Sequence, residues 1–167
     1  MTSPQQVRSI AGGIAITGAV GVAIFQALLA LGLPLGKAAW GGSSAELSVT
    51  LRISSAIAVG VWLAIASVFA TRAGFLRPAW MSMGGAVCTT WAVFGLLCVG
   101  CLLNWASRSP TERNIWGPIT TILVISTFLL ARSERPDAQE EVPLMIAVPE
   151  SERSKSMISR LSGYSIG

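Results

Sequence analysis

The chain has 167 residues, of which 52% are hydrophobic and only 12% are charged, and its formal net charge is +4. A water-soluble domain of this size buries only about 70% of its chain surface, so it could not hide so much apolar surface from water. The basic residues lie at segment ends rather than in one cluster, which excludes a nucleic-acid-binding surface and fits contact with anionic lipid headgroups. We therefore expect the chain to lie in a lipid bilayer.

Four stretches without Asp, Glu, Lys or Arg predict four membrane-spanning helices. Each is close to, or longer than, the roughly 20 apolar residues that a helix needs to cross the hydrocarbon layer. Strands of a membrane barrel are about 10 residues long and alternate in polarity, whereas these stretches are longer and do not alternate. In chain order the stretches are 9–36, 53–71, 78–107 and 114–131.

The predicted fold is all-α: a four-helix transmembrane bundle followed by a flexible C-terminal tail. We place the membrane domain at 1–131 and a disordered or surface-lying cytoplasmic tail at 132–167, where charges and prolines interrupt the apolar pattern. The expected spans are roughly 9–33, 47–71, 79–103 and 111–131.

The segment after the first span is expected to turn the chain back toward the membrane. Pro34 weakens the end of the first helix, and Trp40 has the apolar ring and polar N–H that suit the headgroup layer. Glycines permit the sharp reversal. They are Gly36, Gly41 and Gly42.

Two predicted capping boxes account for the only acidic residues before the tail. Ser43 stands three residues before Glu46, so we expect the second helix to begin there. In the fourth helix Ser109 would be the N-cap, Pro110 the first helical residue and Glu112 the carboxylate that returns to the cap. Two carboxylates near a membrane surface are also what acid–base catalysis needs, and the sequence leaves this alternative open.

Small residues repeat every four positions in the first two spans and predict close helix packing. We expect this packing to occur mainly within one bundle, with association of several chains as the alternative. Gln26 and Asn104, the notable amides near the apolar stretches, are expected to hydrogen-bond between helices. The small residues are Ala11, Ala15, Ala19, Ala23 and Ala27, then Ala56, Gly60 and Ala64.

An even number of spans places both termini on one side of the membrane and the first and third loops on the other. If the termini are cytoplasmic, eight basic residues lie inside and four outside, which the positive-inside rule favours. Counting only the residues near the spans, the ratio is five to four. We expect a multi-pass protein of the plasma membrane with cytoplasmic termini.

The four charge-free stretches contain no histidine either, which argues against a proton relay or an ion-coupled pump in the interior of the bundle. We predict no catalytic, cofactor-binding or metal-binding residues, and no cofactor. The cysteines at 88, 98 and 101 are interpreted as small buried side chains rather than as a redox or metal site.

Three loop motifs resemble those of small, uncharacterised four-span bacterial membrane proteins. The shared features are a Pro-x-Gly turn ending in Gly-Gly, a Leu-Arg-x-x-Ser entry, and an Asn-x-x-Ser-Arg-Ser-x-x-Glu-Arg segment. The resemblance covers roughly 28–118 and implies a four-span architecture without an assigned activity. The matching positions are Pro34, Gly36, Gly41, Gly42, Leu51, Arg52, Ser55, Asn104, Ser107, Arg108, Ser109, Glu112 and Arg113.

These motifs map to the first and third loops, hence to one membrane face. We hypothesise a polar cluster there that either locks the two loops together or receives an anionic headgroup or peptide. Its candidate members are Glu46, Arg52, Asn104, Arg108, Glu112 and Arg113.

The predicted function is that of a non-enzymatic membrane component or accessory subunit. The alternative is an oligomeric transporter or channel for a small solute, with a path lined by Ser, Thr and Cys side chains. The expected partners are the lipid bilayer and homo- or hetero-oligomer subunits that pack through the small-residue helix faces; nucleic acid is not among them.

Overall fold

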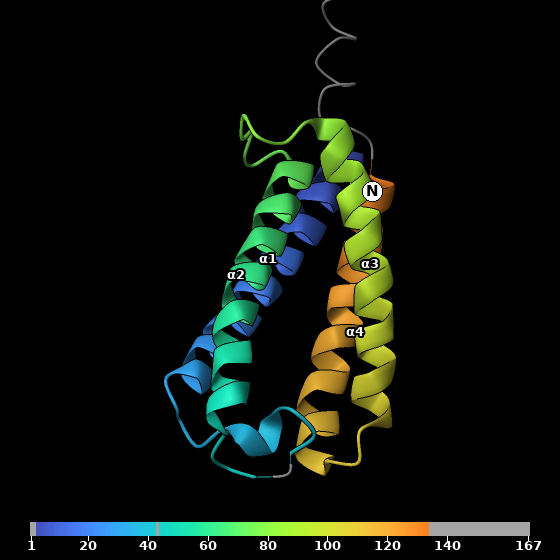
Figure 1. Cartoon of the computed structure of the whole chain (residues 1–167). Helices are drawn as coiled ribbons and strands as arrows, with labels where there is room; N and C mark the ends of the chain where they lie inside the picture. Colours follow the sequence, from blue (N-terminus) through green and yellow to red (C-terminus); the bar gives the residue numbers. More distant parts are fainter. Residues whose placement is uncertain (1–2, 43, 134–167) are drawn as a thin grey trace, which may run out of the picture. The chain divides into compact units, whose positions relative to one another are not determined.

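The computed structural model describes residues 3–42 and 44–133; the predicted tail, apart from its first two residues, lies outside them. The described part contains four α-helices and one short 3₁₀-helix (Figure 1). The predicted all-α four-helix fold is therefore confirmed. The elements are α1 (Pro4–Ala30), η1 (Gly36–Ala38), α2 (Val49–Ala73), α3 (Met83–Ala106) and α4 (Pro110–Arg132).

All four α-helices are long and apolar enough to cross a membrane. Only 22% to 39% of the residues in their most apolar windows are buried inside the bundle, so most apolar side chains point outward. Every helix exposes large apolar residues, such as Ile10, Ile57, Leu102 and Ile122. A soluble monomer does not expose so much contiguous apolar surface. The chain is a membrane protein, and lipid is the solvent that fits its helices.

The four helices form two antiparallel pairs. α1 packs along α2 and α3 packs along α4, while α1 and α4 make the main contact between the pairs. The start of α1 and the end of α4 lie beside the α2–α3 connection, and η1 and the α3–α4 connection lie at the opposite end (Figure 1). We call this opposite end the loop end; it comprises residues 31–42, 44–48 and 107–109.

The alanine stripe of α1 packs inside the bundle, as expected. Its first four members are buried, and Gly12 beside it allows α1 to touch α2, because a Cβ atom there would lie 2.5 Å from the Cβ of Ala73. The expectation of internal packing is wrong for the stripe of α2. That stripe faces outward, and its residues are exposed: Ala56, Gly60 and Ala64.

The ends of α1 and α2 differ from the expected positions for reasons of local hydrogen bonding. α1 ends at Ala30 because Gly32 adopts a φ of +92°, and Leu33 N–H donates to the Leu28 carbonyl over 3.1 Å. This is a Schellman motif, so Gly32 ends the helix and Pro34 only follows it.

The expected start of α2 at Ser43 is wrong. The N-cap is Ser48, whose hydroxyl accepts from Leu51 N–H over 3.5 Å, and Ser43 itself lies outside the described residues. Glu46 precedes this cap by two residues and is exposed. The Ala45 carbonyl accepts from Gly36 N–H over 2.9 Å, which holds this segment in the loop instead of a helix.

Two arginines of α2 stabilise the ends of neighbouring helices. Arg52 Nε donates to the Ala30 carbonyl at the end of α1 over 3.1 Å, and Arg72, only 1% exposed, donates to the carbonyls of Ala131 and Ser133 at the end of α4. Carbonyls at a helix C-terminus have no intrahelical partner, and lipid offers no donor. Each guanidinium therefore satisfies carbonyls at the negative end of a helix dipole.

Candidate functional site

The start of α4 fastens the two loops of the loop end to each other. Ser109 is the N-cap, as predicted: its hydroxyl accepts from Glu112 N–H over 3.3 Å, and Pro110 is the first helical residue. The same hydroxyl donates to the Lys37 carbonyl over 3.3 Å. One serine side chain thus caps a helix and joins the third loop to the first.

The carboxylate of Glu112 does not return to its own cap, so this half of the predicted capping box is wrong. One oxygen accepts from Gly41 N–H over 3.3 Å, and the other accepts from the Ser107 hydroxyl over 2.6 Å. The first loop brings Gly41 N–H close to α4, so the carboxylate of Glu112 accepts from this loop instead of from its own cap. Glu112 consequently links the two loops and lies half-buried between them.

Tryptophan side chains also join the loop end to the helices. Trp116 Nε1 donates to the Ala38 carbonyl over 2.6 Å, and its ring meets Phe25 edge to face with centroids 4.8 Å apart. Trp40 Nε1 donates to the hydroxyl of Ser55, which is fully buried, over 3.2 Å. The N–H groups of both indoles are therefore satisfied, and these hydrogen bonds orient the two rings.

The backbone at Trp40 is strained. Its φ is +54°, and Gly41 and Gly42 follow with φ values of +84° and +66°. A bulky residue in this left-handed region costs about 1–3 kcal/mol, and such strain is concentrated at functional sites. Gly42 also lies against Ser109, because a Cβ atom there would come within 2.5 Å of the serine Oγ.

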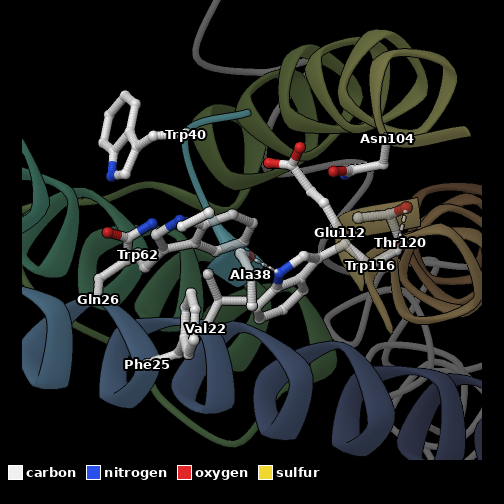
Figure 2. Close-up of a pocket in the computed structure, with 11 residues that line it drawn as sticks. Val22, Phe25, Gln26, Ala38, Trp40, Trp62, Asn104, Glu112, Trp116 and Thr120 are labelled. Atoms are coloured by element: carbon white, nitrogen blue, oxygen red, sulfur yellow. Dashed lines mark hydrogen bonds between the residues drawn. The ribbon is translucent and has the colours of Figure 1, made fainter. Parts of the chain in front are cut away.

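These elements line an open pocket of about 290 Å³ at the loop end. In Figure 2 Trp40, Trp62 and Gln26 lie on one side of it, Glu112 and Asn104 lie on the other, and Trp116 lies between them. Trp40 is 45% exposed, so the pocket reaches the surface beside this ring. Its lining residues are Val22, Phe25, Gln26, Ala38, Ala39, Trp40, Trp62, Asn104, Glu112, Trp116 and Thr120.

Two amides in this pocket do not make the expected hydrogen bonds between helices. The amide oxygen of Gln26 is buried without a hydrogen-bond partner among the residues that the structure describes. An unsatisfied buried acceptor costs about 1–3 kcal/mol. Asn104 lines the same pocket, and the described part of the chain contains no side-chain partner for it. The prediction of helix-to-helix bonds from these amides is wrong.

The pocket contains two of the six residues proposed as a polar cluster, Asn104 and Glu112. Arg52 binds the end of α1, and Arg113 Nη1 donates to the Ser107 carbonyl over 3.4 Å, while Glu46 and Arg108 are exposed. Within residues 3–42 and 44–133 no ion pair joins the six to one another. Hydrogen bonds to backbone groups and to a hydroxyl, rather than paired charges, hold these loops together.

The aromatic lining was missed by reasoning from charge. Trp62 lies in the middle of a charge-free stretch and reads as a lipid-facing residue, whereas the structure turns its side chain into the pocket. Trp116 was recognisable only as an interfacial aromatic residue. The available signal was the presence of Trp40 and Trp116 near Glu112 at the same end of the predicted bundle, and it did not extend to Trp62.

The fold and the site together define a four-helix membrane protein with an aromatic pocket near one end of the bundle. The residues that the structure describes contain no group of His, Cys, Asp and Glu side chains able to hold a metal ion. No protein-family model, curated protein or solved structure matches this chain.

Proposed function

We propose that the protein is a non-enzymatic component of the plasma membrane that binds a small ligand in the loop-end pocket. The pocket itself is the observation that carries this proposal, since it combines an aromatic lining with a few polar groups. Such a combination is typical of small-molecule sites in proteins. With cytoplasmic termini, as the basic residues favour, the pocket opens on the outer face.

The strained backbone of Trp40 beside this pocket supports a binding role. Trp40 has a φ of +54°, in the left-handed region that a bulky residue rarely adopts. Backbone strain of this kind is concentrated at ligand-binding and other functional sites.

The interior of the bundle supports binding in preference to passage through a single chain. Beyond the pocket, toward the termini, the space between the helices is filled by a buried apolar cluster that includes Phe69, Leu97 and Leu123. The buried hydroxyls of Thr90 and Ser126 donate to carbonyls of their own helices. A solute that entered the pocket would therefore meet packed side chains, not a polar path.

The exposed small-residue stripe of α2 gives the protein a surface for helix association in the membrane. We accordingly propose an accessory subunit that presents its pocket beside a partner. The three loop motifs described above support placing the chain with the small four-span bacterial membrane proteins that they resemble.

The proposal is tested by native mass spectrometry of the full chain extracted from its own membranes. Ala38→Phe fills the pocket, whereas Ala56→Phe adds the same ring to an outward-facing position of α2. We expect a bound small molecule or lipid on the original chain and on Ala56→Phe, and its loss from Ala38→Phe. Equal occupancy in all three proteins, or a solute flux through liposomes carrying the purified chain alone, would overturn the proposal.

A further inference from the structure

We infer that a groove between α1 and α4 binds one acyl chain of an anionic phospholipid, and that Arg132 at the end of the groove holds the phosphate group. This inference goes beyond the proposed function, because the groove and the loop-end pocket are separate. The groove is lined by side chains of residues 7–18 of α1 and 119–129 of α4. It lies toward the end of the bundle where α1 begins and α4 ends, which we call the terminal end (Figure 1).

The groove is mainly apolar, and glycines of α1 give it its shape. Two neighbouring hollows of about 500 and 310 Å³ form it. At Gly18 the two helices touch, because a Cβ atom there would clash with the side chain of Leu123. A Cβ atom on Gly13, in contrast, would meet nothing within 4 Å, so the space beside this residue is open to the hydrocarbon layer. The residues that line both hollows are Ile10, Ile14 and Ile122.

The length and depth of the groove fit a chain from one leaflet of the bilayer. Residues 7–18 of α1 rise by roughly 16 Å, which is about half of the ~30 Å hydrocarbon layer. The groove begins near the start of α1 and ends near the middle of that helix, so it lies in the leaflet of the terminal end. A partner helix that crossed the membrane would run along the whole of α1 and α4, whereas an acyl chain needs only this half. The occupant that fits is therefore a lipid chain.

The charge of the terminal end selects an anionic headgroup for this lipid. Arg132 is the last residue of α4 and lies one turn beyond Leu129, which lines the groove. Its side chain is exposed, with the guanidinium carbon 5.4 Å from the centroid of the Phe128 ring, and it forms no ion pair among the described residues. The acidic side chains of the described residues, Glu46 and Glu112, both belong to the opposite end of the bundle. Arginine near a membrane surface attracts anionic lipids.

Binding is measured by native mass spectrometry of the full chain in detergent, mixed with equal amounts of phosphatidylglycerol and phosphatidylcholine that carry the same acyl chains. We expect one phosphatidylglycerol molecule to stay bound, with a preference of about fivefold over phosphatidylcholine, since one arginine near the headgroups provides selectivity of this order. Equal binding of the two lipids, as expected if the six acidic residues between 134 and 152 neutralise Arg132, would overturn the inference. A second copy of the chain bound in place of lipid would do the same.

Two variants with matched controls test the groove and the arginine separately. Gly13→Leu fills the groove, whereas Gly21→Leu adds the same side chain to a position of α1 outside it, where a Cβ atom also meets nothing within 4 Å. Arg132→Gln removes the cation, and Arg108→Gln removes an exposed arginine of the loop end. We expect Gly13→Leu to lose the bound lipid, Arg132→Gln to lose the preference for phosphatidylglycerol, and both controls to behave as the original chain. Lipid retained by Gly13→Leu, or a preference retained by Arg132→Gln, would refute the inference.

The position of the chain is determined with a phosphatidylglycerol that carries a photoreactive diazirine in one acyl chain, in liposomes that contain the full protein. We expect its crosslinks to concentrate on residues 7–18 and 119–129, and to be lost from Gly13→Leu but not from Gly21→Leu. Crosslinks spread evenly over the four helices would identify ordinary boundary lipid and contradict the inference. Ala38→Phe, which fills the loop-end pocket, should leave the crosslinks unchanged, so this site and the proposed function are tested independently.

Discussion

Replacing Arg52 by Met should destabilise the bundle without removing the ligand site. Arg52 was a candidate member of the polar cluster, yet its Nε donates to the Ala30 carbonyl over 3.1 Å. The guanidinium also lies against Gly32, because a Cβ atom on Gly32 would come within 2.9 Å of Arg52 Cζ. Arg108, another arginine of the same membrane face, is exposed and forms no hydrogen bond or ion pair among the described residues. The two residues therefore form a matched pair.

The expected magnitude follows from the two interactions that Arg52 makes. A hydrogen bond from a charged donor contributes about 1.5–3 kcal/mol. A cation at a helix C-terminus adds about 0.3–1 kcal/mol. Arg52→Met should therefore lower the free energy of unfolding by about 2–4 kcal/mol, and Arg52→Lys, which keeps the charge but not the guanidinium geometry, by less. Arg108→Met should stay within about 0.5 kcal/mol of the original chain.

The measurement is thermal unfolding in nanodiscs followed by intrinsic tryptophan fluorescence. The difference for Arg52→Met corresponds to a melting temperature lowered by roughly 5–15 °C. Below this temperature the variant should keep the ligand of the loop-end pocket in native mass spectrometry, because Arg52 does not line the pocket. Equal melting temperatures for the Arg52 and Arg108 variants would refute the assignment of Arg52 to the end of α1, and a loss of ligand affinity would return it to the site.

Two further glycine pairs test the packing. Gly12→Ala should lower the free energy of unfolding by about 1–3 kcal/mol, because its Cβ would lie 2.5 Å from that of Ala73. The Cβ of Gly13→Ala would meet nothing within 4 Å, so this variant should gain up to about 1 kcal/mol. Thermal unfolding measures both. Gly42→Ala should lower the melting temperature more than Gly41→Ala. Both variants require an alanine in the left-handed region, which costs about 1–2 kcal/mol, but only Gly42→Ala also clashes with Ser109. Equal melting temperatures would contradict the close approach of the two loops.

The number and location of the helices were predictable because hydrocarbon thickness sets their length and excludes charges from their central parts. Their ends were less predictable, since they depend on single backbone hydrogen bonds. Gly32 ends α1 two residues before Pro34. Ser48 rather than Ser43 caps α2, because the Ala45 carbonyl accepts a hydrogen bond from Gly36 N–H and stays in the loop. A sequence with several serines and glycines in one loop does not determine which of them is used.

The pocket was only partly predictable, because the candidate cluster was chosen mainly from charged residues, and some of these stabilise the fold instead of lining the pocket. Arg52 satisfies a helix end, and Glu46 and Arg108 are exposed, whereas Trp62 and Gln26 from the apolar stretches line the pocket. Which face of a membrane helix turns inward depends on its neighbours, and α1 and α2 illustrate this. Both carry a small-residue stripe, but only that of α1 is buried.

The polarity of the pocket follows from the way a membrane protein must treat its helix ends. Carbonyls at helix C-termini need donors that lipid does not provide, so Arg52 and Arg72 are directed to them. The N-terminus of α4, in contrast, favours a negative group, and Glu112 lies in its first turn. At the loop end, Arg52 is engaged at the C-terminus of α1, whereas Glu112 is held in the first turn of α4. The two residues serve different helix ends, so they form no ion pair with each other.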